Sequence, residues 1–270
     1  MSKTVLITGA STGIGRETAK YFQQKGWNVS ASMRSPEKEK ELTKLQNVIC
    51  PKLDVTDENS IALAIEKTII EYGIVDVIVN NAGYSLTGVF EAATTAQLRH
   101  QYDVNVFGVM NVVRSILPYF RERKSGTIVN VSSIGGKITL PLFSMYQSTK
   151  WAVSGFSEAL QYELRPFNIK VKIVEPGVVI TDFYDRSMTH TKKEGLTDYN
   201  EYVKNIHAVN EKFVSKGNKP IKSAKVIYKA ATSTNWKPYY PSGGDVKVFL
   251  TLRKLIPLSW FNSVIRRVYK

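Results

Sequence analysis

Residues 4–15 read TVLITGASTGIG, and this stretch decides the fold. Its first five residues are apolar or β-branched and predict a short buried strand. Gly9, Gly13 and Gly15 follow at once, and residues 15–25 have helical periodicity. A glycine-rich turn between a strand and a helix lets the backbone approach a pyrophosphate and points helix N–H groups at its charge. We therefore predict a phosphate-binding turn here, with plain turn geometry as the alternative role of the glycines.

Outward from this turn, the chain alternates short β-branched runs with longer segments of helical periodicity. The strand candidates are residues 4–8, 28–33, 48–53, 75–80, 127–132 and 170–175. The helix candidates between them are residues 15–25, 60–72, 95–120 and 144–165. Strands joined by helices in this way predict an α/β fold with a Rossmann-type, doubly wound parallel sheet. We expect one domain spanning residues 1–270.

The last third of the chain has a different character. After Thr181 it becomes polar and rich in Lys, Thr and Asn, with scattered aromatic residues. We predict that residues 182–222 form a mobile loop or substrate lid. Amphipathic helices are predicted at residues 224–232 and 245–269, the second interrupted at Pro257, so that residues 224–270 form a C-terminal helical extension. No run approaches the roughly 18 apolar residues that a membrane-spanning helix needs.

The composition sets the broad class of protein. Hydrophobic residues make up 43% and charged residues 22%, which excludes a disordered or fibrous chain. The formal net charge of +14 would attract nucleotide phosphates, acidic lipid headgroups or nucleic acid. The lone cysteine, Cys50, cannot form an intrachain disulfide and fits a reducing compartment, so we expect a cytoplasmic protein. The three histidines are far apart in the sequence, and we assign no metal site.

The end of the second strand candidate bears on the choice of cofactor. A site for NAD normally offers a carboxylate there to the ribose 2′-hydroxyl. This chain has Met33 followed by Arg34. Because a guanidinium favours a 2′-phosphate, we predict NADP (NADPH) in preference to NAD. The alternative is that Arg34 is a solvated residue at a strand end.

A tyrosine and a lysine near the start of a predicted helix suggest proton transfer. Tyr146 and Lys150 lie four residues apart and therefore share one helix face. A phenol, with an ordinary pKa near about 10, is a poor base at neutral pH, but a neighbouring ammonium favours the phenolate. We predict that Tyr146 exchanges the proton that accompanies hydride transfer. Such pairs also occur by chance on solvated helices.

Two further polar residues are candidates for the same site. Ser133 follows the strand candidate 127–132, at the edge where open α/β sheets bind their ligands. Its hydroxyl is predicted to bond the substrate oxygen, although either Ser132 or Ser133 could instead cap the turn. Asn105 is an unfavourable residue inside a helix unless its amide is used. We predict that Asn105 holds a water that relays protons from Lys150.

Seven segments in a fixed order resemble the short-chain dehydrogenase/reductase family. They are TGASTGIG at residues 8–15, LDVT at 53–56, NNAG at 80–83, DVN at 103–105, VSS ending at Ser133, YQSTK at 146–150 and PGVVIT at 176–181. Their spacing is similar to that of the family, and they cover residues 4–181. The chain length, ASMRSPEK at residues 31–38 and the C-terminal extension also resemble 17β-hydroxysteroid dehydrogenase-like members.

The resemblance implies a catalytic tetrad. In it Asn105 anchors the proton relay, Ser133 stabilises the substrate oxygen, Tyr146 is the general acid/base, and Lys150 binds the ribose and lowers the tyrosine pKa. It also implies a homodimer or homotetramer paired through the helices that hold Asn105 and Tyr146.

The resemblance further implies a set of cofactor contacts. They are Gly9, Ser11, Gly13, Ile14 and Gly15 at the pyrophosphate turn, Arg34, Asp54 at the adenine, Asn81 beside the central sheet, Tyr146, Lys150, and Val179 and Thr181 at the nicotinamide carboxamide and phosphate. Family members with two basic anchors have Lys or Arg where this chain has Thr12. The NADP prediction therefore depends on Arg34.

Apolar residues near these motifs suggest the kind of substrate. The cleft candidates are Tyr84, Leu140, Leu142 and Phe143, and the aromatic residues of the predicted lid are Phe183, Tyr184, Tyr199, Tyr202 and Phe213. If they line a cleft, it would suit a lipid-like, steroid-like or other hydrophobic alcohol or ketone. The alternative is that they are ordinary core residues.

The last predicted helix leaves two roles open. Its apolar face holds Trp260, Phe261, Val264, Ile265 and Val268, and Arg266, Arg267 and Lys270 lie off that face. Such a helix either lies in an anionic membrane interface, as a peripheral contact, or packs against the substrate region or a second subunit.

Two other classes of function are compatible with the sequence. A regulator of the same fold would bind NADP(H) without turnover, but it would not need the full set of catalytic residues. A nucleic-acid binder would use the positive charge, yet the sequence has no recognisable motif for reading nucleic acid, so we expect no such partner.

Overall fold

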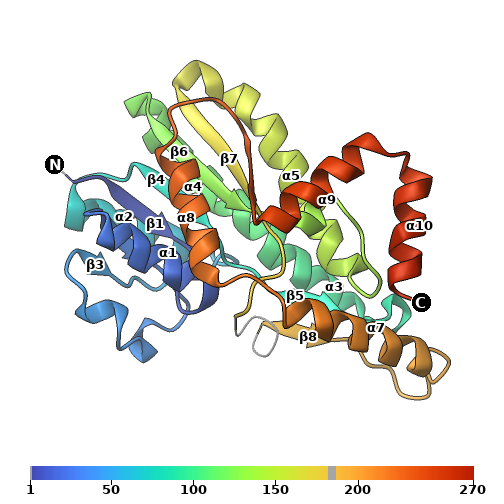
Figure 1. Ribbon diagram of the computed structural model, residues 1–270. Coiled ribbons are helices and arrows are strands. Elements are labelled where there is room, and N and C mark those ends of the chain that lie inside the picture. Colours follow the sequence, from blue (N-terminus) through green and yellow to red (C-terminus); the bar gives the residue numbers. More distant parts are fainter. Residues whose placement is uncertain (1, 182–186) are drawn as a thin grey trace.

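The computed structural model describes residues 2–181 and 187–270 of the chain. Seven strands form one parallel sheet in the order β3-β2-β1-β4-β6-β7-β9 (Figure 1). Their bounds are β1 Thr4–Ile7, β2 Asn28–Ala31, β3 Val48–Ile49, β4 Val77–Asn80, β6 Gly126–Val131, β7 Ile169–Pro176 and β9 Tyr239–Ser242. The strand order reverses between β1 and β4, which is where open α/β sheets form a crevice for ligands. The predicted doubly wound sheet is confirmed.

Helices cover both faces of this sheet (Figure 1). One face is covered by α1 and α8 and the other by α2, α4 and α5. The α-helices have the bounds α1 Gly13–Gln24, α2 Glu58–Tyr72, α3 Thr95–Tyr102, α4 Gly108–Arg123, α5 Ser144–Leu164, α7 Asn200–Val214, α8 Pro220–Thr232, α9 Gly244–Leu255 and α10 Leu258–Val268. Val5 and Ile7 of β1 pack with α1 and α8, whereas Leu6 between them packs with α2, α4 and α5. This alternation along one strand is the two-residue period of a sheet buried on both faces.

The seventh strand of the sheet, β9, was not predicted from the sequence. Its residues, Tyr239-Tyr-Pro-Ser242, do not form a β-branched run, and Pro241 lacks an N–H group. A proline is tolerated in a strand at the edge of a sheet, where one side of the backbone has no neighbouring strand. β9 occupies that edge and, among the described strands, pairs only with β7.

The predicted continuous helix over residues 95–120 is wrong in one respect. After α3 the backbone forms a π-helical turn, Asp103–Phe107, before α4 begins. π-helical turns inside helices are rare and are frequently found at functional sites. The turn contains Asn105, whose side chain is buried and bonded to a neighbouring loop.

The region after Thr181 holds more regular structure than a loop. β8 (Met188–His190) pairs in parallel with β5 (Ser85–Thr87), and α7 lies within the predicted lid. Residues 182–186 lie outside the described part, and with them the predicted lid residues Phe183 and Tyr184. Within the described residues, 2–181 and 187–270, no helix is long and apolar enough to cross a membrane.

The predicted C-terminal extension divides into two parts. α8 packs into the core against α1, and β9 joins the sheet, so residues 224–242 belong to the main body. α9 and α10 lie to one side of it, separated by the predicted break at Pro257 (Figure 1).

Candidate active site

The glycine-rich turn forms an open cradle at the end of β1. Gly9 has a left-handed φ of +66°, and a Cβ there would lie 2.8 Å from the Ala82 backbone. A Cβ on Gly15 would collide with the Gly9 carbonyl oxygen and the Asn81 side chain. Side chains are therefore excluded from the turn by close backbone packing. α1 begins at Gly13, its first turn has no acidic residue, and its N-cap, Thr12, makes no side-chain cap bond. The first N–H groups of this helix fit an anionic pyrophosphate.

Asn81 ties this turn to the end of β4. Its Nδ2 donates to the carbonyl oxygens of Thr8 and Gly9, at 3.1 Å each. Its backbone N–H donates to Thr8 Oγ1 at 3.0 Å, and Ala82 N donates to the same oxygen at 3.1 Å. These hydrogen bonds fix the glycine-rich turn against the end of β4.

The far end of the site carries a cation and a carboxylate. Arg34 is exposed and Asp54 half-buried. Burial would raise the pKa of the Asp54 carboxyl, but two hydrogen bonds from Thr56 and the charges of Arg34 and His100 hold it below its ordinary value. Asp54 is therefore an anion that can accept hydrogen bonds.

A second arginine near the site, Arg16, is already paired with carboxylates. Arg16 donates from Nη1 to Glu41 at 3.0 Å, pairs through Nη2 with buried Glu39, and donates from Nε to the Ser11 carbonyl. Both terminal nitrogens of its guanidinium thus contact carboxylates. Arg34, by contrast, lines the cleft and forms no ion pair within the described residues.

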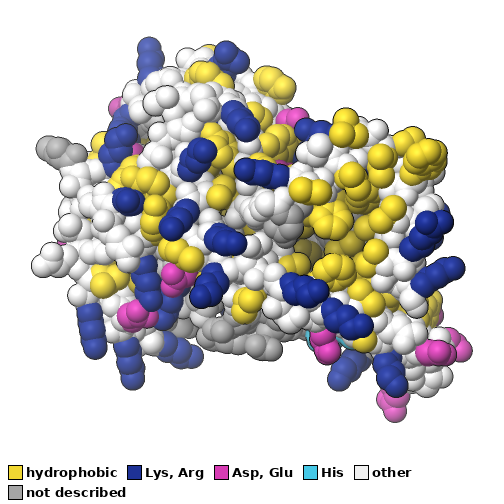
Figure 2. All heavy atoms as spheres, in the orientation of Figure 1, with side chains coloured by type: hydrophobic (Ala, Val, Ile, Leu, Met, Phe, Trp, Pro, Cys, Tyr) yellow, Lys and Arg dark blue, Asp and Glu magenta, His cyan; other side chains and the backbone are white. Residues whose placement is uncertain are grey.

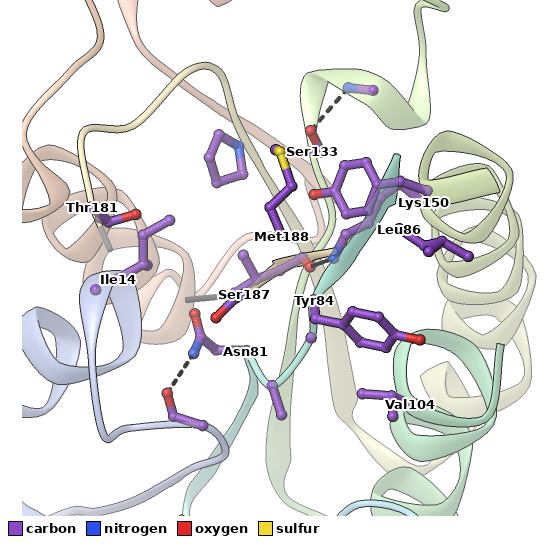
Figure 3. A pocket seen from close by; sticks show the side chains of 18 of the residues that line it. Ile14, Asn81, Tyr84, Leu86, Val104, Ser133, Lys150, Thr181, Ser187 and Met188 are labelled. Atoms are coloured by element: carbon purple, nitrogen blue, oxygen red, sulfur yellow. Dashed lines mark hydrogen bonds between the residues drawn. The ribbon is translucent and has the colours of Figure 1, made fainter. Parts of the chain in front are cut away.

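One cleft of about 730 Å³ runs along this edge of the sheet. Every predicted site residue except Gly15 and Asn105 lines it. The lining members are Gly9, Ser11, Gly13, Ile14, Arg34, Asp54, Asn81, Ser133, Tyr146, Lys150, Val179 and Thr181. In Figure 3, Ile14 and Thr181 lie on one side of the cavity and Ser133 and Lys150 on the other. The methyl group and Cβ of Thr181 come within 3.4 Å of the position that a Cβ on Gly13 would take.

Tyr146 and Lys150 stand on the first turns of α5. The Lys150 Nζ lies 5.7 Å from the centre of the Tyr146 ring and donates to the Val131 carbonyl at 3.0 Å. The lysine is 7% exposed, and burial lowers the pKa of Lys150 to about 8. The amine is therefore still largely protonated at neutral pH, and its charge lies close to the phenol.

The structure separates the two serines at the end of β6. Ser132 is buried, and its hydroxyl lies 3.1 Å from the Lys150 carbonyl and 2.9 Å from Ser154 Oγ. Ser133 is half-buried, and its Oγ accepts a hydrogen bond from Gly135 N at 3.0 Å (Figure 3). The Ser133 hydroxyl therefore caps the turn, which was the alternative role considered for it from the sequence. Because it accepts that bond, its own hydrogen remains to donate toward the cleft.

Asn105 lies behind the cleft wall. Its Nδ2 donates to the Tyr84 carbonyl at 2.8 Å and to Thr149 Oγ1 at 3.1 Å, and its Oδ1 accepts from Tyr84 N at 3.0 Å. Thr149 in turn donates to the Tyr146 carbonyl at 2.7 Å. The side chain therefore fixes Tyr84 and α5. A relay water would have to bind the second lone pair of Oδ1 or the main-chain carbonyl of Asn105.

The apolar candidates from the sequence are only partly in the cleft. Tyr84, Leu140 and Phe143 line it, but Leu142 does not. Tyr199 lines a separate cavity beside α7, and Tyr202 and Phe213 are exposed. The described part of the chain therefore does not support the prediction that Tyr199, Tyr202 and Phe213 line the cleft.

Other lining residues were not found from the sequence. Ser187, Met188 and Thr189 reach the cleft from the segment around β8. Buried Gln147 accepts a hydrogen bond from Leu140 N at 2.8 Å and holds the loop before α5.

A chain of buried hydrogen bonds beneath the site was also not predicted. It runs from Asn80 through Asn130 to Ser157, with both bonds at 2.8 Å. The asparagines within the otherwise apolar strands could have predicted these bonds, because a buried polar side chain needs a hydrogen-bond partner.

Comparison with known proteins identifies the family. A family model described as short chain dehydrogenase matches residues 3–192. A 3-ketodihydrosphingosine reductase of Bacteroides thetaiotaomicron is 36% identical over 231 residues, which cover 86% of this chain and 84% of the relative. The crystal structure of a short-chain dehydrogenase from Streptomyces avermitilis has a TM-score of 0.83 at 35% identity, covering 98% of this chain and 97% of that one.

A further solved structure, ElxO with NADP bound, has a TM-score of 0.76 at 29% identity, covering 92% of this chain and all of that one. The chain therefore belongs to the short-chain dehydrogenase/reductase family and is an oxidoreductase, as its seven segments predicted. The likeness to 17β-hydroxysteroid dehydrogenases is only a loose one within this family.

Proposed function

We propose that the protein transfers a hydride between NADP(H) and an alcohol or carbonyl carbon of an apolar substrate. The observation that carries this proposal is the single cleft in which the glycine-rich turn, Ser133, Tyr146 and Lys150 meet. One end of the cleft suits a dinucleotide and the other offers a proton donor and a hydrogen-bond donor.

The residues present fit a nicotinamide dinucleotide. Side chains are excluded at Gly9 and Gly15, so the backbone and the start of α1 can hold the pyrophosphate. Asp54 would accept from the adenine, and Arg34 would bind a 2′-phosphate, which favours NADP over NAD. ElxO, a structural neighbour, was solved with NADP bound. When bound, the nicotinamide ring supplies or accepts the hydride.

The proton is handled by the side chains of this chain. Ser133 donates its hydroxyl hydrogen to the substrate oxygen and holds it beside Tyr146. The Tyr146 hydroxyl gives its proton to that oxygen in reduction and takes it back in oxidation. The Lys150 ammonium stabilises the phenolate that results. A water held at Asn105 would carry the proton onward to solvent.

Apolar side chains line the substrate end of the cleft, among polar ones that include His100 and Gln147. Leu86, Leu140, Phe143 and Met188 line it, with Tyr84 beside them. These apolar side chains near Ser133 and Tyr146 suit a carbonyl group on a long alkyl chain or another lipid-like body. The name of the Bacteroides relative, a 3-ketodihydrosphingosine reductase, supports a substrate of this class.

We also propose a lid and a subunit contact. Residues 182–222 would act as the lid, because Ser187 and Met188 from this segment reach the cleft. Pairing into a dimer or tetramer would use α5 and the π-helical turn with the following α4, where Trp151 and Tyr162 of α5 and Phe107 of the turn leave rings exposed in the single chain. The protein would work in the cytoplasm.

The proposal is tested by measuring the loss of NADPH or NADH absorbance when the protein is mixed with each member of a panel of carbonyl compounds. The panel holds long-chain ketones, steroid-like ketones and short polar ketones, and each is run with both cofactors. We expect oxidation of NADPH in preference to NADH and turnover of apolar carbonyls. Tight NADPH binding with no turnover across the panel would favour the non-catalytic regulator. Turnover restricted to short polar ketones would contradict the substrate class.

A further inference from the structure

The two C-terminal helices carry an apolar surface that the chain itself leaves uncovered. Its exposed members are Val248, Leu252 and Leu255 on α9 and Trp260, Val264 and Val268 on α10. A spacing of three or four residues places each set along one side of its helix. Leu255 is 75% exposed and Trp260 68%. We name these six residues the C-terminal apolar face.

Other residues fix these helices to the body of the protein. Phe261 of α10 is buried, and the Arg253 guanidinium of α9 lies 5.5 Å from its ring centre, a contact that joins the two helices to each other. Near the end of α10, the Tyr269 hydroxyl donates to Asn210 Oδ1 at 3.0 Å, and its ring lies 6.3 Å from that of Phe213. Because α10 already has an inward-facing apolar side, the C-terminal apolar face is not needed to hold the helix in place.

The charged side chains of α9 and α10 that follow Asp245 are all basic. Residues 246–270 contain six basic and no acidic side chains, the basic ones being Lys247, Arg253, Lys254, Arg266, Arg267 and Lys270. Figure 2 shows hydrophobic side chains gathered over α9 and α10, with Lys and Arg around them. An apolar surface bordered by cations is complementary to a partner whose outer layer is anionic and whose interior, beneath that layer, is apolar.

We propose that the C-terminal apolar face docks on a membrane surface that carries anionic phospholipids. The apolar side chains would enter the boundary between headgroups and acyl chains, where Trp260 is well suited, and the basic side chains would contact phosphates. A second copy fits less well, because a two-fold contact through this face would bring two sets of six cations together. The proposal is independent of the proposed catalytic function.

Co-sedimentation of the full-length protein with vesicles tests the proposal. Vesicles of phosphatidylcholine alone are compared with vesicles that also contain phosphatidylserine. We expect binding to the second kind, at least about tenfold weaker in the variant Leu255→Ser/Trp260→Ser. The variant Arg266→Gln/Arg267→Gln should bind roughly 25-fold more weakly, at about fivefold per basic residue.

The matched control is Ile70→Ser on α2, an apolar residue that is 77% exposed and lies away from α9 and α10. It should bind vesicles like the unaltered protein, and circular dichroism checks that all variants fold. Failure to bind anionic vesicles would overturn the proposal, as would equal losses in the control and the Leu255→Ser/Trp260→Ser variant. A dimer that dissociates in this double variant, without vesicle binding by the unaltered protein, would assign the face to self-association instead.

Discussion

Replacing Lys150 by methionine removes the ammonium beside Tyr146 and keeps a side chain of similar length. The Nζ lies 5.7 Å from the centre of the tyrosine ring. At an effective dielectric constant of about 20, a unit charge at that separation stabilises a phenolate by roughly 3 kcal/mol. In the proposed mechanism alcohol oxidation needs the phenolate as base, so the rate at neutral pH should fall roughly 100-fold.

The pH dependence distinguishes this electrostatic role from a structural one. Burial lowers the pKa of Lys150 to about 8, so the unaltered enzyme itself loses the positive charge as the pH rises through that value. The ratio of the two rates should therefore be largest below about pH 8 and shrink above it. Steady-state rates of alcohol oxidation across this range measure the ratio.

Two controls accompany this measurement. Circular dichroism and NADPH binding report whether the variant folds and holds the cofactor after losing the bond to the Val131 carbonyl. A deficit that stays the same at every pH in a folded, NADPH-binding variant would refute the reasoning.

Two further changes test other parts of the account. Arg34→Ala should raise the KM for NADPH by roughly 10- to 100-fold and leave that for NADH unchanged, because only NADPH has a 2′-phosphate for the charge-assisted bond; equal effects on both cofactors would contradict the NADP assignment. Burial raises the pKa of Glu175 to about 7, against the opposing charges of Lys137 and Lys254, and its Oε1 has no hydrogen-bond partner among the described residues. The penalty for ionising this buried group grows as the pH rises from about 4.5 to 7. The free energy of unfolding of Glu175→Gln, measured by urea denaturation, should therefore rise by roughly 2–3 kcal/mol relative to that of the unaltered protein between pH 5 and pH 8. A difference between the two proteins that does not change with pH would contradict this prediction.

Much of the fold was predictable because local patterns and tertiary packing agree. The strands that lie inside the sheet are β-branched and buried on both faces, so their sequences read as continuous apolar runs. β9 was missed because an edge strand that contains Pro241 needs little β-propensity of its own. The π-helical turn was missed because it depends on the bonds of Asn105 to Tyr84, which lies on another segment.

The candidate site was predictable where one short motif supplies several residues. Tyr146 and Lys150 are on one helix, and the three glycines are in one turn. Met188 and Gln147 were missed because their places depend on β8 pairing with β5 and on the loop before α5. Ser132 and Ser133 were indistinguishable in the sequence, and only the packing of Ser132 against Ser154 separates them.

The hydroxyl group of Tyr146 is the centre of the proposed chemistry, and Tyr146→Phe tests it most directly. The variant should still bind NADPH, and its turnover of any carbonyl that the unaltered enzyme reduces should fall by at least roughly 100-fold, the scale of general acid catalysis. Turnover that survives removal of this hydroxyl would contradict the account.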